Sequence, residues 1–229
     1  MKAKPATSSA SDAEGVAGLR LLNTYAGLAE RGEHLLDSLL GGQPPKQWAH
    51  YPDDDAIDHE HGYQWFYHSH SPEDRPGAEE HGHIHLFARR KLWSRRLRSA
   101  RESSFAELLG GPQEPVNTRH LLTIAFDAKG LPVSLFTVNS WVTGDLMLSA
   151  ETTALLLEKM VLETGHSDVD AVIESVIRLY RIDIRKLLLR RDLALNEFYG
   201  ERVLANESLE LLSECTIDVD ATIRALDLL

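Results

Sequence analysis

Cysteine is nearly missing from this 229-residue sequence, which contains only Cys215. A single thiol excludes a disulfide framework and a multi-thiolate zinc or iron–sulfur site within one chain. No segment approaches the roughly 18 uninterrupted apolar residues that a membrane-spanning helix needs. The first twelve residues contain two lysines but no apolar run of signal-peptide length. These absences predict a cytoplasmic protein that neither spans a membrane nor is secreted.

Positive charge is scarce as well. The chain has 24 Lys and Arg against 35 Asp and Glu, which gives a formal net charge of −11. Affinity for a polyanion comes largely from positive surface, so this balance argues against a general nucleic-acid binder. The phosphate-cradling patterns Gly-x-Gly-x-x-Gly and Gly-x-x-x-x-Gly-Lys-Ser/Thr do not occur, and neither does the nucleophile elbow Gly-x-Ser-x-Gly.

Hydrophobic periodicity and turn signals predict an α+β fold. A small, polar tail of residues 1–11 is expected to be disordered, and residues 12–229 are expected to form a single domain. N-terminal helices are expected within 12–45, a histidine-rich sheet region at 46–145, and a helical region at 146–229 that packs on the sheet. The antiparallel sheet is predicted to have about four strands in two hairpins, at 63–70, 81–88, 119–126 and 132–140. Helices are expected at 89–109, 150–164, 168–196, 201–214 and 218–229.

Histidine is concentrated in one stretch: eight of the eleven histidines fall between residues 50 and 85. Side chains alternate faces along a strand, so His68 and His70 share one face, and His81, His83 and His85 share one face of the next strand. If the strands pair, directly opposed Cβ atoms lie about 4.5 to 5.5 Å apart. A metal about 2.0 to 2.1 Å from each nitrogen can bridge such a pair.

The five histidines therefore predict a site for a divalent transition metal, and imidazole ligands suit Zn, Fe, Mn or Cu. Glu80 enters the second strand from the loop and is a candidate general base or carboxylate ligand. The acidic stretch 53–61 could add a carboxylate that orients a histidine. The alternative is that the histidines form only the polar face of an exposed sheet. The preferred ligands are His68, His70, His83 and His85, with His81 next.

Two other segments are candidate substrate contacts. Asn139, Trp141 and Thr143 share strand parity and could line a pocket, although they could instead satisfy backbone groups or belong to the core. Arg89 and Arg90 begin a run of seven positive charges within residues 89–101. This run could hold a small anionic substrate or an acidic protein partner, or it could be a solvated helix face.

Several motifs carry resemblances to known families. His81-Gly82-His83-Ile84-His85 resembles the alternating histidines of the histidine-triad nucleotide hydrolases, in which the middle histidine attacks a phosphate, but Gly82 departs from the apolar residue expected there. His68-Ser69-His70 is similar to the cupin metal motif, without the glutamate and the second half that cupins need. A broader resemblance, to an uncharacterised bacterial family of unknown function, is carried by Trp48-Ala49-His50-Tyr51-Pro52, Tyr67-His68-Ser69-His70, Glu80-His81-Gly82-His83-Ile84-His85, Gly130-Leu131-Pro132 and Trp141-Val142-Thr143-Gly144. It implies that these motifs form one module, and it carries no activity.

The predicted function is transition-metal binding by histidines on adjacent strands, in a protein that could be a metalloenzyme, either a hydrolase or an oxygenase, acting on a small anionic substrate. One alternative is a non-catalytic metal-binding or accessory protein. Another is a histidine-triad-like phosphate-ester hydrolase. The sequence leaves the metal, the substrate and the oligomeric state open.

Overall fold

A single twisted sheet organises the chain in a computed structural model, which describes residues 10–69, 80–110, 117–198 and 202–228. Its strands follow the order β1-β2-β3-β4-β5-β7, and the short strand β6 pairs in parallel with β4 where β5 has ended. All other neighbours are antiparallel. The strands are β1 (Tyr51–Ile57), β2 (Tyr63–His68), β3 (Gly82–Arg89), β4 (Thr118–Phe126), β5 (Pro132–Val138), β6 (Leu146–Met147) and β7 (Leu211–Thr216).

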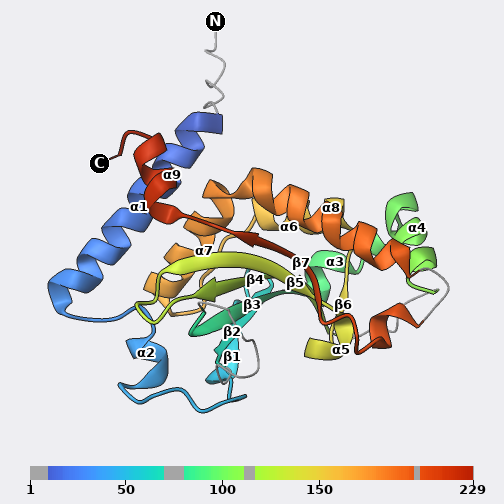
Figure 1. Ribbon diagram of the computed structural model, residues 1–229, viewed down its shortest axis with the longest axis horizontal. Coiled ribbons are helices and arrows are strands. Elements are labelled where there is room, and N and C mark those ends of the chain that lie inside the picture. The colour runs from blue at the N-terminus through green and yellow to red at the C-terminus, as the bar shows by residue number, and fades with distance from the viewer. Residues whose placement is uncertain (1–9, 70–79, 111–116, 199–201, 229) are drawn as a thin grey trace, which may run out of the picture.

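Helices cover one face of this sheet. In Figure 1, α6, α7 and α8 lie above the sheet, whereas α5 lies below it. The long first helix packs against α7, where Arg20 of α1 forms an ion pair with Glu174 at 2.6 Å. The helices are α1 (Ala10–Arg31), α2 (Asp37–Leu40), α3 (Arg90–Trp93), η1 (Arg96–Arg98), α4 (Ala100–Leu108), α5 (Ser140–Thr143), α6 (Ala150–Glu158), α7 (Ser167–Leu179), α8 (Arg181–Glu197), η2 (Val203–Ala205) and α9 (Val219–Ala225).

Strand alternation gives the two faces of the sheet different chemistry. On the helix-covered face, Trp65, Ile84 and Leu122 are buried together with Val172 of α7 and Leu187 of α8 in the main hydrophobic core. Successive side chains point to opposite faces, so the residues between these core positions face away from the helices. The second face is therefore the one that can carry a site, and it holds the aromatic and histidine side chains of β2 and β3.

The α+β class and the mainly antiparallel sheet are confirmed, but the predicted number of about four strands is wrong. The described part of the chain contains seven strands. The helix predicted at 201–214 is wrong at its C-terminal end, because Leu211–Thr216 pairs with β5 as strand β7. Long-range pairing of this kind overrides local helix propensity. The acidic segment Tyr51–Ile57 likewise forms β1 despite its poor strand propensity.

Other predicted boundaries also shift. The expected helix at 168–196 is divided at Tyr180 into α7 and α8. The strand expected to continue to 140 ends at Val138, and Ser140–Thr143 forms the short helix α5. Residues 1–9 of the predicted tail lie outside the described residues, as do residue 70 of the predicted strand 63–70 and residues 71–79 of the loop that follows it. None of the helices in the described ranges has the length and apolar character that would let it cross a bilayer.

Candidate metal centre

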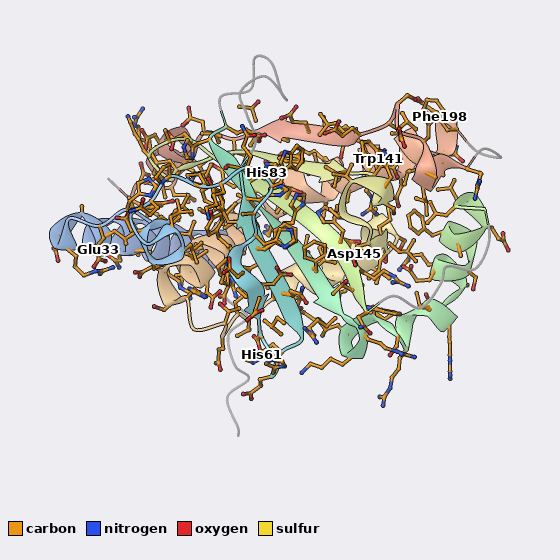
Figure 2. All side chains as sticks on the ribbon, turned by 90° about the horizontal axis from the view of Figure 1, so that it is seen from below. Glu33, His61, His83, Trp141, Asp145 and Phe198 are labelled. Carbon is orange, nitrogen blue, oxygen red and sulfur yellow. The ribbon has the colours of Figure 1, made fainter. Side chains whose placement is uncertain are left out.

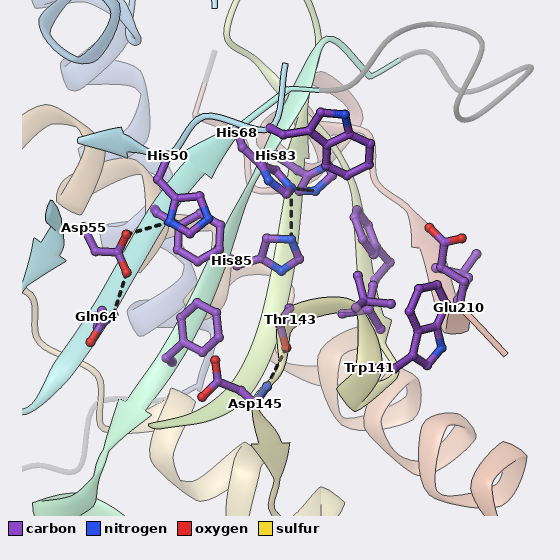
Figure 3. A pocket seen from close by; sticks show the side chains of 17 residues that line it. His50, Asp55, Gln64, His68, His83, His85, Trp141, Thr143, Asp145 and Glu210 are labelled. Atoms are coloured by element: carbon purple, nitrogen blue, oxygen red, sulfur yellow. Dashed lines mark hydrogen bonds and ion pairs between the residues drawn. The ribbon is translucent and has the colours of Figure 1, made fainter. Parts of the chain in front are cut away.

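Three histidines from β2 and β3 converge on the face of the sheet that the helices leave open. Antiparallel pairing sets His68 directly opposite His83, and His85 follows two residues later on the same face. The three side chains are buried and each offers a nitrogen within 4.8 Å of the others. Figure 2 looks at this side of the molecule and places His83 on the central strands, with Trp141 and Asp145 nearby. Figure 3 shows the three imidazoles side by side.

One of the distances between the Nε2 atoms has the length expected between two ligands of a tetrahedral metal, and a second is shorter. The distance from His68 Nε2 to His85 Nε2 is 3.3 Å. Two nitrogens that each lie about 2.0 to 2.1 Å from a tetrahedral metal are separated by about 3.3 to 3.4 Å. His68 Nε2 and His83 Nε2 are closer, at 2.6 Å. That pair needs to separate by about 0.7 Å to span the edge of such a tetrahedron.

The opposite ring nitrogens of two of these histidines have partners behind the site. His83 Nδ1 lies 3.4 Å from Glu80 Oε1, and both side chains are buried. His85 Nδ1 lies 3.1 Å from the Thr123 hydroxyl and 3.1 Å from His120 Nε2. Partners at the distal nitrogen fix the orientation and the tautomer of a ligating histidine. Glu80 thus lies at ion-pair distance from the His83 ring nitrogen opposite the one that faces His68.

His120 joins the site through an irregularity in β4 that the sequence did not reveal. Leu86 pairs with Leu122, but the next residue, Phe87, pairs with His120, so Leu121 is an extra residue in β4. A bulge of this kind reverses the alternation of side chains beyond it. His120 therefore faces the histidines, whereas regular alternation would place it in the core. Burial, with a smaller contribution from the charge of Arg191, lowers the pKa of His120 to about 3, so the ring is neutral at pH 7.

The three-histidine cluster opens into a cavity of about 480 Å³. This size lies within the range of small-molecule sites. Aromatic and aliphatic side chains make up much of its wall beside the histidines, and α5 and the start of β7 close the side away from β2. The lining residues are Trp48, His50, Asp55, Gln64, Phe66, His68, His83, His85, Phe87, Phe136, Val138, Trp141, Val142, Thr143, Asp145, Glu210 and Leu211.

A chain of hydrogen bonds runs along one wall of this cavity. Gln64 donates to one carboxylate oxygen of Asp55 at 2.7 Å, and His50 Nδ1 lies 3.0 Å from the other oxygen. Arg89 donates to the side-chain oxygen Oε1 of Gln64 at 3.1 Å. The His50 ring stacks on Phe66 with centroids 3.6 Å apart. His50 is thus held by a carboxylate at one nitrogen, in the geometry that prepares an imidazole for proton transfer.

The irregular pairing of β1 explains how this wall is built. Tyr51 pairs with Tyr67 and Ala56 with Trp65, so four residues of β1 stand opposite one residue of β2. Asp55 adopts a left-handed backbone conformation in this bulge, with φ of 55°. Aspartate tolerates this region better than most residues. The acidic stretch 53–61 was a candidate source of a carboxylate that orients a histidine. Asp55 from this stretch does lie beside a histidine, but the histidine is His50, which is not one of the five predicted ligands.

The remaining predicted site residues have other positions. His70 lies outside the described residues. His81 is exposed and its Nδ1 lies 3.2 Å from the Tyr67 hydroxyl, so it stands apart from the cluster. Asn139 is fully buried and caps α5, with its amide donating to the Val203 carbonyl at 2.8 Å. Trp141 and Thr143 line the cavity, whereas Arg89 and Arg90 do not.

Residues 16–217 match a family described as Domain of unknown function (DUF6969). The chain belongs to this family. The resemblance to an uncharacterised family is thereby confirmed, and the matched region includes the whole of the cluster and of the cavity wall. No curated protein and no solved structure matches the chain. Membership in DUF6969 brings no described activity, so the functional argument rests on the geometry of the site.

Proposed function

We propose that this protein binds a divalent transition metal through the Nε2 atoms of His68, His83 and His85, and that it uses the metal in an enzymatic reaction. The observation that carries the proposal is the convergence of three buried Nε2 atoms, two of them separated by the edge length of a nitrogen tetrahedron. Imidazole nitrogens suit zinc, iron, manganese and copper, and the cluster does not favour one of them.

The tautomers that the surroundings favour leave lone pairs available for a metal at two of the three histidines. Glu80 Oε1 lies 3.4 Å from His83 Nδ1, at ion-pair distance, and a proton on that nitrogen would leave its Nε2 with a lone pair. His85 Nδ1 can donate to the Thr123 hydroxyl, which leaves its Nε2 as a second lone pair aimed at the same point. Buried lone pairs that face one another are costly unless a proton or a cation lies between them, and here either a proton on His68 Nε2 or a metal ion would meet that need.

The open side of the cluster supports a catalytic role over a structural one. Structural zinc sites are closed by four protein ligands, whereas catalytic sites have three and keep a position for water or substrate. Here the open side faces the cavity. A divalent ion held there would polarise a bound water or a substrate oxygen. His50, held by Asp55, is the residue placed to take or give a proton, while Glu80 orients His83.

The arrangement gives less support to a histidine-triad hydrolase. That chemistry would use alternating histidines along one strand face, but His81 stands apart from His83 and His85 and precedes the first residue of β3. The cavity also gives no support to the small anionic substrate that the basic run suggested. Among the described residues that line it, there is no lysine and no arginine.

The test is elemental analysis of untagged protein by plasma mass spectrometry. We expect near-stoichiometric metal in the wild type and its loss in the His83→Ala, His85→Ala double variant. His59→Ala is the matched control, because this exposed histidine lies in the turn between β1 and β2. Reconstitution with zinc, iron, manganese and copper should then rank the metals. Absence of metal after all four reconstitutions would refute the proposal.

A further inference from the structure

The wall of the cavity has an unusual charge balance. Three carboxylates line it, those of Asp55, Asp145 and Glu210, and the lining residues in the described ranges include no lysine or arginine. The carboxylate of Asp55 is already engaged by His50 and Gln64. Asp145 and Glu210 remain as the acids that a ligand can meet, and both lie away from the histidines in Figure 3.

Asp145 is held at a fixed place on the cavity floor. Its carboxylate accepts a hydrogen bond from the Thr118 hydroxyl, and its amide donates to the Thr143 hydroxyl oxygen at 3.3 Å. Burial raises the pKa of its carboxyl, although the Thr118 bond and the charge of Arg119 oppose the shift. A positive group entering the cavity would stabilise the ionised carboxylate, because an opposite charge favours the charged form of an acid.

Aromatic rings make up much of the remaining wall. Phe66 and Phe87 stack with centroids 5.5 Å apart, and Phe136 contacts His83 at 5.1 Å between ring centroids. Trp141 closes the side toward β7, where its indole nitrogen donates to the Leu209 carbonyl at 3.1 Å. Aromatic faces attract cations, and aromatic enclosures with nearby acids recognise alkylated ammonium groups.

From this combination we infer that the substrate is a small organic cation, an amine or a quaternary ammonium compound with an apolar body. The inference rests on the proposed function, since it names the substrate class of the same site. A divalent metal at the histidines repels a positive group, so the ammonium group lies away from them, within the field of the Asp145 and Glu210 carboxylates on the remaining wall. The uncharged part of the substrate then faces the metal.

The test compares two probes of nearly equal shape, choline and 3,3-dimethylbutan-1-ol, which differ in the charge of the central atom. Their hydroxyl groups are the same, so any contact with the metal contributes equally to both. Binding is measured by isothermal titration calorimetry on the protein as purified, after its metal content has been determined. We expect choline to bind at least tenfold more tightly, which corresponds to about 1.4 kcal/mol.

Variants locate the source of this preference. Asp145→Asn and Glu210→Gln are each expected to reduce the choline preference severalfold, and Glu210 is exposed, so its substitution leaves the core intact. Asp220→Asn is the matched control, because it removes the same charge from a side chain on α9 that is 81% exposed. The preference should survive in this variant.

Equal binding of the two probes, no choline binding up to 10 mM, or a preference that persists in both cavity variants would overturn the inference. The metal content of the same samples separates this failure from that of the proposed function. Metal without a choline preference leaves the metal site standing and removes the substrate class. A choline preference in protein that holds no metal after reconstitution would remove the metal site and leave the substrate class standing.

Discussion

Replacing Glu80 with glutamine tests how the histidine cluster is oriented. The carboxylate lies 3.4 Å from His83 Nδ1, longer than an ideal charge-assisted hydrogen bond. Loss of a partner behind a metal ligand costs about 10- to 100-fold in metal affinity. The long distance places the expected loss near tenfold, or about 1.4 kcal/mol. The assay is competition for zinc with a fluorescent chelator of known affinity.

The size of the effect separates three roles of this residue. A loss near tenfold fits an orienting carboxylate, whereas a direct ligand should cost far more than 100-fold and a general base should leave zinc affinity unchanged. Glu60→Gln is the control, because this glutamate is exposed in the turn after β1. Zinc affinity within twofold of the wild type in Glu80→Gln would refute the orienting role. A matching loss in Glu60→Gln would show that the effect is not specific to the site.

Three further substitutions probe the surroundings of the cluster. His50→Ala should leave metal content unchanged in elemental analysis, because His50 lies outside the three-histidine set; loss of metal would make it a ligand. Gly82→Ala would place a Cβ 2.7 Å from the His68 carbonyl oxygen and against the Tyr67 hydroxyl, so urea denaturation should show a loss of about 1 to 3 kcal/mol; unchanged stability would show that β2 and β3 can separate. Asp58→Asn should lower the free energy of unfolding by about 2 to 4 kcal/mol at pH 7, because the buried carboxylate accepts hydrogen bonds from two backbone amides of its own turn. Burial alone would raise the pKa of Asp58, but hydrogen bonds from the His61 amide, the His61 ring and the Glu163 amide lower it below its ordinary 3.8. The stabilising effect of the ionised Asp58 carboxylate is therefore present above about pH 4 and is lost as the pH falls through its folded-state pKa. A difference in the free energy of unfolding between wild type and Asp58→Asn that does not change with pH would contradict this.

Strand alternation was enough to bring three of the five predicted histidines together. His68 and His83 are opposed across an antiparallel pair, and His85 shares their face. This part could be predicted because alternation is a property of the local backbone and needs no knowledge of the rest of the fold. Alternation fails at His81, since β3 begins only at Gly82 and the residue before a strand does not follow its parity.

Other parts of the site depend on pairings between distant segments. The bulge at Leu121 turns His120 toward His85, and the irregular pairing of β1 with β2 brings Asp55 to His50. Neither irregularity has a local sequence signal, because each arises from how one strand fits its neighbour. The helix predicted over the leucines of β7 is wrong for a similar reason. Their strand conformation depends on pairing with β5, which the local sequence does not indicate.

The sequence by itself determined that histidines gather on one face of a β2–β3 pair, because the spacing of side chains along a strand is fixed by its covalent geometry. Only the tertiary structure decided what the histidines face. The cavity wall is assembled from Trp48, from Trp141 of α5 and from Glu210 before β7, which are far apart in the chain. Their approach depends on packing and strand order, and these are properties of the whole fold.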